Sequence, residues 1–363
     1  MYGGAAVDNK DPRVRPMTSL VKFFGVSDPR GARSEGLADF LDELRLAAGI
    51  NPIFLVNDME TVGDWTESAN GTFDVAVNTS GKQGTNAQKF TATAAGDGTQ
   101  NVQTLIIRAG DAIPSGDKTG RVETVGDDWR DSDFVGFWAK PDAATDFNAA
   151  GDLKFNVRNG GTWGTAVNVP AVPAATVAWQ RIEIDITSFQ RDKVDAIRFE
   201  LTSGPAAAED VSIDQIIRYK FGNGYGPVWG GSVFPFPVKN AATPTLKQIA
   251  TFETGAVGTT QTVLAATAAA RGNLGPVVVS GTGNARYGEK QVWIQRGGFS
   301  YWPVGTTITG KTQMTCVWFT GHKLKNSAAT TTQDRRVIAR ILEDTTVTED
   351  VAVLVEWGFF AEK

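Results

Sequence analysis

The sequence predicts an all-β protein made of a β-sandwich jelly roll and a second β domain, preceded by an extended N-terminal arm and one short helix. Short segments alternate apolar and polar residues with a period of two, which is the pattern of strands with one buried face, as in Trp179–Ile186 and Val194–Leu201. The 40 glycines and turn clusters such as Asn159-Gly160-Gly161 separate these segments. A chain of 363 residues is long enough for two or three domains.

The composition indicates a protein that does not act on nucleic acid or membranes. The formal net charge is −5 and the sequence pI is about 5.2, so we expect no basic surface for nucleic acid or anionic lipid. No run reaches the roughly 18 apolar residues of a membrane-spanning helix. The N-terminus lacks the apolar core of a signal peptide, so we expect the product to be made in a cytoplasm and not exported by that route.

The chain has one cysteine, Cys316, and one histidine, His322. An internal disulfide, a thiolate metal cluster and a two-histidine zinc site are therefore excluded. A His-dependent catalytic triad is not expected, because both residues fall in one strand-turn segment with no evident third partner. The apolar neighbours of Cys316 predict a buried structural thiol.

The first 52 residues read as an arm followed by a helix. Residues 1–33 contain breakers such as Asp11-Pro12 and Asp28-Pro29 and cannot build a core of their own. A terminal segment of this kind is ordered only when something holds it. We expect a partner subunit or another part of an assembly to do so, with folding back on its own domain as the alternative.

Ser34–Ala48 is predicted as the one short helix. Leu37, Phe40, Leu41 and Leu44 form an apolar stripe, Ser34 is a candidate N-cap, and Gly49 ends the helix. The stripe needs a surface to pack on. A sheet of the same chain and a neighbouring subunit are both open as that surface.

Residues 53–221 read as one sandwich of strands separated by Gly- and Asn-rich turns. The predicted strands are Pro52–Val56, Phe73–Asn78, Lys89–Thr93, Val102–Arg108, Phe134–Lys140, Leu153–Arg158, Trp179–Ile186, Val194–Leu201 and Val211–Ile217.

The next segment, 222–245, contains the aromatic, Gly- and Pro-rich run that begins at Phe221 and ends at Pro237. We expect an ordered connector without regular structure, packed on a domain or on a partner. Residues 246–363 read as a C-terminal β domain. Its predicted strands are Leu246–Phe252, Val277–Ser280, Gln291–Gln295, Met314–Thr320, Arg336–Leu342 and Val351–Phe360.

Three stretches of the sandwich carry a family resemblance. They are Phe54–Glu60 followed by Gly63-Asp64-Trp65, then Asp133–Lys140, and finally the Trp179 strand with Val211–Ile217. Across about residues 53–221 the chain resembles the calcium-containing β-jelly-roll carbohydrate-binding modules that accompany many glycoside hydrolases.

The resemblance implies a structural calcium held by Glu60 and Asp214 together with backbone carbonyls. Asp214 sits between Ile213 and Ile216, so its carboxylate needs a partner if it is buried. Two carboxylates brought together repel each other, and a hard cation relieves the repulsion. The alternative is that each carboxylate accepts hydrogen bonds from a turn. Met59 stands where the family often has Phe, which leaves the carboxylate unaffected.

Glycan binding in such modules uses exposed aromatic rings that stack on sugars. The candidates are Trp65, Trp129 and Trp163, because each lies beside a predicted turn. Trp138 and Trp179 lie in predicted strands and are expected in the core. The alternative for the first three is that each covers a core.

The acidic run Asp127–Asp133 is a candidate cation loop or a candidate pair of catalytic carboxylates. It lacks the glycine and the distal glutamate of an EF-hand. Glycoside hydrolysis needs two carboxyl groups at a defined separation, which adjacent loop aspartates do not establish. We expect a solvated turn.

Taken together, these features predict a non-enzymatic structural or decoration protein of a virion, most simply of a tailed bacteriophage. The arm, the helix and the C-terminal domain would dock on a major capsid or tail protein and on copies of the chain itself. The jelly roll would face outward for weak, multivalent binding of host-surface polysaccharide. The alternatives are a free-standing carbohydrate-binding, lectin-like protein and a polysaccharide-degrading enzyme using Asp131 or Asp133.

Overall fold

The structure is a computed structural model of the 363-residue chain. It describes residues 50–67, 73–93, 101–105, 126–172, 177–201, 208–230, 233–237, 245–252, 263–265, 273–279, 291–303, 315–319, 323–326, 339–342 and 350–356. The predicted arm, the predicted helix Ser34–Ala48 and His322 lie outside these residues.

The described residues form strands and one short 3-10 turn, which confirms the all-β prediction. Their bounds are β1 (Ile53–Asn57), η1 (Val62–Asp64), β2 (Trp65–Glu67), β3 (Phe73–Asn78), β4 (Ala87–Ala92), β5 (Asn101–Leu105), β6 (Phe134–Pro141), β7 (Leu153–Asn159), β8 (Thr162–Trp163), β9 (Val167–Asn168), β10 (Gln180–Asp185), β11 (Val194–Leu201), β12 (Glu209–Tyr219), β13 (Val233–Pro237), β14 (Ile249–Phe252), β15 (Val263–Ala265), β16 (Asn273–Val279), β17 (Gln291–Gln295), β18 (Gly297–Pro303), β19 (Thr315–Phe319), β20 (Lys323–Asn326), β21 (Ala339–Ile341) and β22 (Asp350–Glu356). No helix within the described residues is long and apolar enough to cross a membrane.

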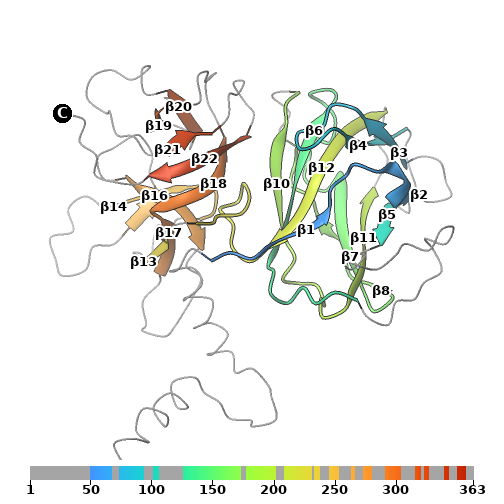
Figure 1. The fold of residues 1–363 in the computed structure, drawn as a ribbon, viewed down its shortest axis with the longest axis horizontal. Coiled ribbons are helices and arrows are strands. Elements are labelled where there is room, and N and C mark those ends of the chain that lie inside the picture. Colours follow the sequence, from blue (N-terminus) through green and yellow to red (C-terminus); the bar gives the residue numbers. More distant parts are fainter. Residues whose placement is uncertain are drawn as a thin grey trace, which may run out of the picture.

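Strands β1–β12 form a two-layered sandwich, on the right of Figure 1. The first sheet has the order β10-β6-β12-β4-β3, with β1 also paired to β12, and the second has the order β2-β5-β11-β7-β8, with β9 on β7. The core between the sheets contains the buried rings of Phe90, Phe137, Phe155 and Phe199. Phe199 contacts the other three, at centroid distances of 5.4, 5.4 and 5.6 Å, so the β11 alternation seen in the sequence does bury one face.

A β-bulge in β12 decides which side chains face outward. The register against β6 shifts between Asp214 and Ile217, and Gln215 has a positive φ of 43°. Ile213 and Ile216 therefore both enter the core, although they are three residues apart. Asp214 lies opposite Trp138 on the outer face of the first sheet, the face turned away from the core.

Strands β13–β22 form a second unit of two further sheets, on the left of Figure 1. Their orders are β13-β17-β16-β14-β15 and β18-β22-β21-β19-β20, and Cys316 lies in β19. β13 lies in the segment predicted to lack regular structure, and that prediction is wrong there. It is an end strand of its sheet, a position that tolerates Pro235 and Pro237 because no second neighbour needs their missing N–H groups.

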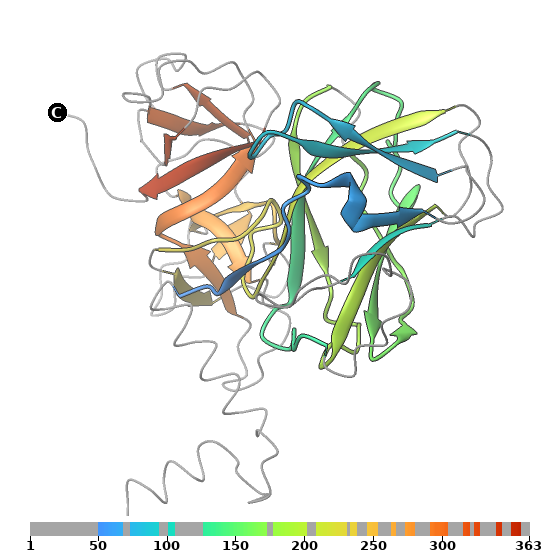
Figure 2. The ribbon, with the colours of Figure 1, turned by 45° about the vertical axis from the view of Figure 1, so that its right-hand side comes forward.

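The connector joins the two units through specific contacts, and the units stay side by side when the view is turned by 45° (Figure 2). The backbones of Trp229 and Phe299 exchange two hydrogen bonds of 3.0 and 2.7 Å, and their rings stack at 5.7 Å. Tyr225 packs on Trp302 of β18 at 5.0 Å. The connector aromatics thus pack against the second unit.

Asn51 lies just before β1, and its side chain forms hydrogen bonds with the backbone that follows β12. Its Nδ2 donates to the carbonyls of Phe221 and Val228 at 2.5 and 2.7 Å, and its Oδ1 accepts from the amides of Lys220 and Phe221 at 3.1 Å each. One side chain therefore fixes the start of β1 against the end of β12 and the connector.

Candidate functional site

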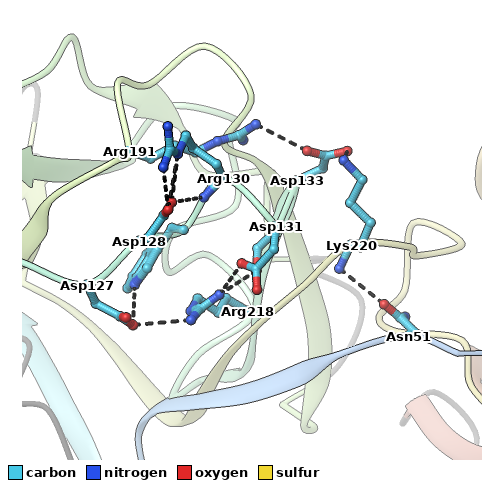
Figure 3. Close-up of polar contacts among 11 residues, drawn as sticks. Asn51, Asp127, Asp128, Arg130, Asp131, Asp133, Arg191, Arg218 and Lys220 are labelled. Atoms are coloured by element: carbon cyan, nitrogen blue, oxygen red, sulfur yellow. Dashed lines mark hydrogen bonds and ion pairs between the residues drawn. The ribbon is translucent and has the colours of Figure 1, made fainter. Parts of the chain in front are cut away.

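The acidic loop before β6 is a cluster of ion pairs (Figure 3). Arg218 of β12 reaches both Asp127, at 3.1 Å, and Asp131, at 2.6 Å. Asp133 pairs with Arg191 at 3.2 Å and with Lys220 at 2.9 Å. Each of these carboxylates therefore has a cationic partner, in place of the solvated turn expected from the sequence.

Asp128 forms a local pair on the outside of the same loop. Its partner Arg130 lies at 2.6 Å, and both side chains are exposed. The hydrogen bonds from Arg130 hold the pKa of Asp128 below its ordinary value. This pair is too exposed to organise the loop.

Arg218 is the centre of this cluster because its side chain is buried. Its guanidinium lies 4.0 Å from the ring centroid of Phe54 and 5.5 Å from that of Trp129, and Nη1 also donates to Ser132 Oγ at 2.8 Å. A buried guanidinium needs charged partners, and the loop supplies them. The carboxylates of Asp127 and Asp131 pair with Arg218, and that of Asp133 pairs with Arg191 and Lys220, so all three have structural roles.

The three candidate stacking tryptophans have different surroundings. Trp65 is 6% exposed and packs on Phe90 and Phe199 in the sandwich core, and Trp129 is 1% exposed, with Nε1 donating to Asp127 at 3.1 Å. Both rings cover a core, which corrects the expectation that they present a face to sugar. Trp163 is partly exposed, and the guanidinium of Arg198 lies 4.1 Å from its ring centroid.

A row of side chains on the outer face of the first sheet was missed by the sequence analysis. Asp214, Trp138 and Arg181 lie opposite one another on β12, β6 and β10, and all three are buried. Tyr301 of β18 covers the row, with its ring 5.3 Å from Trp138 and 5.4 Å from the Arg181 guanidinium. Alternation could place Trp138 in a strand, but not reveal that the second unit would bury it.

Glu183, next to this row on β10, carries a perturbed carboxyl group at the junction between the units. The Tyr219 hydroxyl donates to its Oε2 at 2.8 Å, and a Cβ on Gly222 would collide with that oxygen. Burial raises the pKa of Glu183 to about 7, although the hydrogen bond from Tyr219 and the charge of Lys247 lower it. Burial likewise raises the pKa of Tyr219 and lowers that of Arg181.

The predicted metal ligands Glu60 and Asp214 lie on either side of the turn between β3 and β4. The backbone amides of Lys82 and Gln83 donate to Asp214 Oδ2, and those of Thr85 and Asn86 donate to Glu60. Within the described residues, no three His, Cys, Asp or Glu side chains gather where they could hold a metal ion. Backbone amides occupy three of the four carboxylate oxygens, and the fourth, Asp214 Oδ1, is buried without a hydrogen-bond partner among the described residues. A calcium ion here would need further oxygen ligands from backbone carbonyls.

No family model matches the sequence, and no curated protein matches it either. Among solved structures, the chain is similar to a family 11 carbohydrate-binding module from Clostridium thermocellum, with 17% identity, 46% of this chain and 94% of that chain covered, and a TM-score of 0.31. It is also similar to a family 30 module from the same organism, with 13% identity, 46% and 96% covered, and a TM-score of 0.31. A xylan-binding domain from Paenibacillus barcinonensis gives 15% identity, 46% and 92% covered, and a TM-score of 0.28. At these TM-scores the likeness carries no conclusion about ligand or activity.

Removing the Arg218 side-chain charge should destabilise the fold. In Arg218→Met the carboxylates of Asp127 and Asp131 lose their shared cation, and we expect the free energy of unfolding to fall by about 3 kcal/mol. Denaturant unfolding measures the change. Arg130→Ala is the matched control, because its pair with Asp128 is exposed, and we expect no measurable change there. Equal loss in both variants would contradict this assignment.

Glu183 should make stability depend on pH between about 4.5 and 7. In that window the folded carboxyl keeps its proton while the unfolded one, with an ordinary pKa of 4.5, has lost it. The folded state then binds more protons, so the free energy of unfolding falls as pH rises, by roughly 3 kcal/mol in total, and levels off above pH 7. Unfolding curves from pH 4.5 to 8 should show a flatter profile for Glu183→Gln. The exposed carboxylate variant Asp185→Asn should keep the wild-type slope, and an unchanged slope in Glu183→Gln would refute the assignment.

Proposed function

We propose that this chain is a non-enzymatic structural protein of a virion, most simply a capsid-decoration or tail-associated protein of a tailed bacteriophage. It would assemble with a major capsid or tail protein and with copies of itself. The observation that carries the assembly role is an exposed apolar surface at the start of the sandwich.

This surface, the β1 patch, consists of Ile50, Ile53 and Leu55. Leu55 is 61% exposed and Ile50 58% exposed. Among the described residues β1 pairs with β12 and with no other strand, so within them one of its edges has no partner strand. An exposed apolar strand with an open edge is a site for protein association, since water is displaced and backbone groups find partners there.

The junction between the two units supports a structural role. Aromatic contacts, the Trp229–Phe299 hydrogen bonds and the Asn51 bonds hold the units together. The carboxylates of the acidic loop are used in ion pairs. A protein that transmits contacts across a lattice needs such fixed geometry between its units.

Glycan binding is a second candidate, because Trp163 keeps part of its ring at the surface. Arg198 and Arg158 flank that ring, at 4.1 and 5.6 Å from the centroid, and offer hydrogen-bond donors beside it. We expect Trp163→Ala to abolish any polysaccharide binding on a glycan array, while Trp129→Ala lowers stability through loss of a buried ring. Binding that survives in Trp163→Ala would exclude this site.

Assembly is tested by mass in solution and by co-sedimentation with viral particles. Leu55→Ser combined with Ile50→Ser should weaken self-association and particle binding at least tenfold, because the variant reduces the apolar area available for burial. The melting temperature should stay within about 2 °C, since both side chains are exposed. Val177→Ser, at an exposed apolar position elsewhere, is the control. A wild-type chain that stays monomeric and free of particles would overturn the proposal.

A further inference from the structure

The seam between Glu60 and Asp214 is lined by backbone amides of the β3–β4 turn, residues 79–86. Lys82 N and Gln83 N donate to Asp214 Oδ2 at 2.7 and 2.6 Å. Thr85 N donates to Glu60 Oε1 at 2.9 Å, and Asn86 N donates to Oε2 at 3.0 Å. Four amides thus serve three of the four carboxylate oxygens.

The turn has the conformation that this arrangement requires. Gly84 has a φ of +74°, in the region that favours glycine, and a Cβ at this position would collide with Glu60 Oε1. Gly81 N donates to Thr85 O at 3.2 Å and closes the turn on itself. Asn86 Nδ2 adds a bond of 3.3 Å to the Glu60 carbonyl. The backbone conformation of the turn from Gly81 to Asn86 therefore fits the carboxylates of Glu60 and Asp214.

Successive amide N–H groups present a positive electrostatic potential, which is how backbone turns bind anions. The Asp214 carboxylate needs this compensation, because burial, together with the nearby Glu60, raises its pKa. On three of the four oxygens a divalent cation would have to displace these amide hydrogens, and among the described residues only the buried Asp214 Oδ1 has no hydrogen-bond partner. Amides and a cation are thus alternative solutions to one problem of like-charge repulsion.

We infer that the seam is an amide clasp, in which residues 82–86 occupy the role that the family resemblance assigns to calcium, so that the sandwich closes without a metal ion. The clasp also fixes the position of the β3–β4 turn over the outer face of the first sheet. Lys82 Nζ lies 5.0 Å from the Trp138 ring centroid, so the turn covers one side of the buried row while Tyr301 covers another. This inference is independent of the assembly proposed above.

The dependence of the melting temperature on metal ions distinguishes an amide clasp from a calcium site. The purified full chain is melted with a chelator, with added millimolar calcium, and untreated, and its metal content is measured by mass spectrometry. We expect the three melting temperatures to agree within about 1 °C and the metal content to be far below one ion per chain. A chelator-induced drop that calcium reverses, or one calcium per chain, would overturn the clasp.

A pair of glycine variants tests the clasp itself. Gly84→Ala places a methyl group against the Glu60 carboxylate, whereas Gly161→Ala, at a φ of +85°, meets nothing within 4 Å. Both variants place a non-glycine residue in a left-handed backbone conformation, which lowers stability in each. The additional loss of stability in Gly84→Ala therefore comes from the contact with Glu60 in the clasp. We expect Gly84→Ala to melt at least 5 °C below Gly161→Ala with or without calcium. Equal melting temperatures would refute the amide clasp.

Discussion

Buried charge on a central strand is the constraint on which this structure depends. β12 carries Asp214 on the outer face of its sheet and Arg218 on the other side, both almost fully buried. A buried charge is tolerated only when it is paired or hydrogen-bonded. The partners come from segments far apart in the chain: the turn at 82–86 for Asp214, and the loop at 127–132 for Arg218. Two loops that could otherwise vary are thereby placed by one strand.

The same strand also connects the sandwich to the second unit. Tyr219, at its end, donates to Glu183 on β10, and the residues that follow enter the connector. Because Trp138 and Arg181 are covered by Tyr301, the part of the outer face around them is an internal surface of the molecule. A polar and aromatic face that could look like a binding site from sequence therefore serves as the packing surface between two units.

Local sequence patterns were sufficient to locate the strands, but they did not show which side chains from distant segments would contact one another. Period-two alternation located β6, β10, β11 and β12, because that signal is contained within each strand. It also showed that Asp214 would need a partner, which it has in two amides of the 82–86 turn. The exposure of Trp65 and Trp129 could not be predicted, since a tryptophan beside a turn looks the same whether it covers a core or faces solvent. β13 was not predicted because it contains prolines, which a strand tolerates at the edge of a sheet. The sequence of one strand does not show whether that strand lies at an edge.

The hydrogen bonds of Asn51 have a mechanical consequence. They join the chain before β1 directly to the chain after β12, so the first and last strands of the sandwich share one fastening point. Tension applied between the N-terminal segment and the second unit meets this point first, because both chains leave the antiparallel β1–β12 pair at the same end, and the pair opens from that end only after the Asn51 bonds break. Such a load does not pass through the sandwich core.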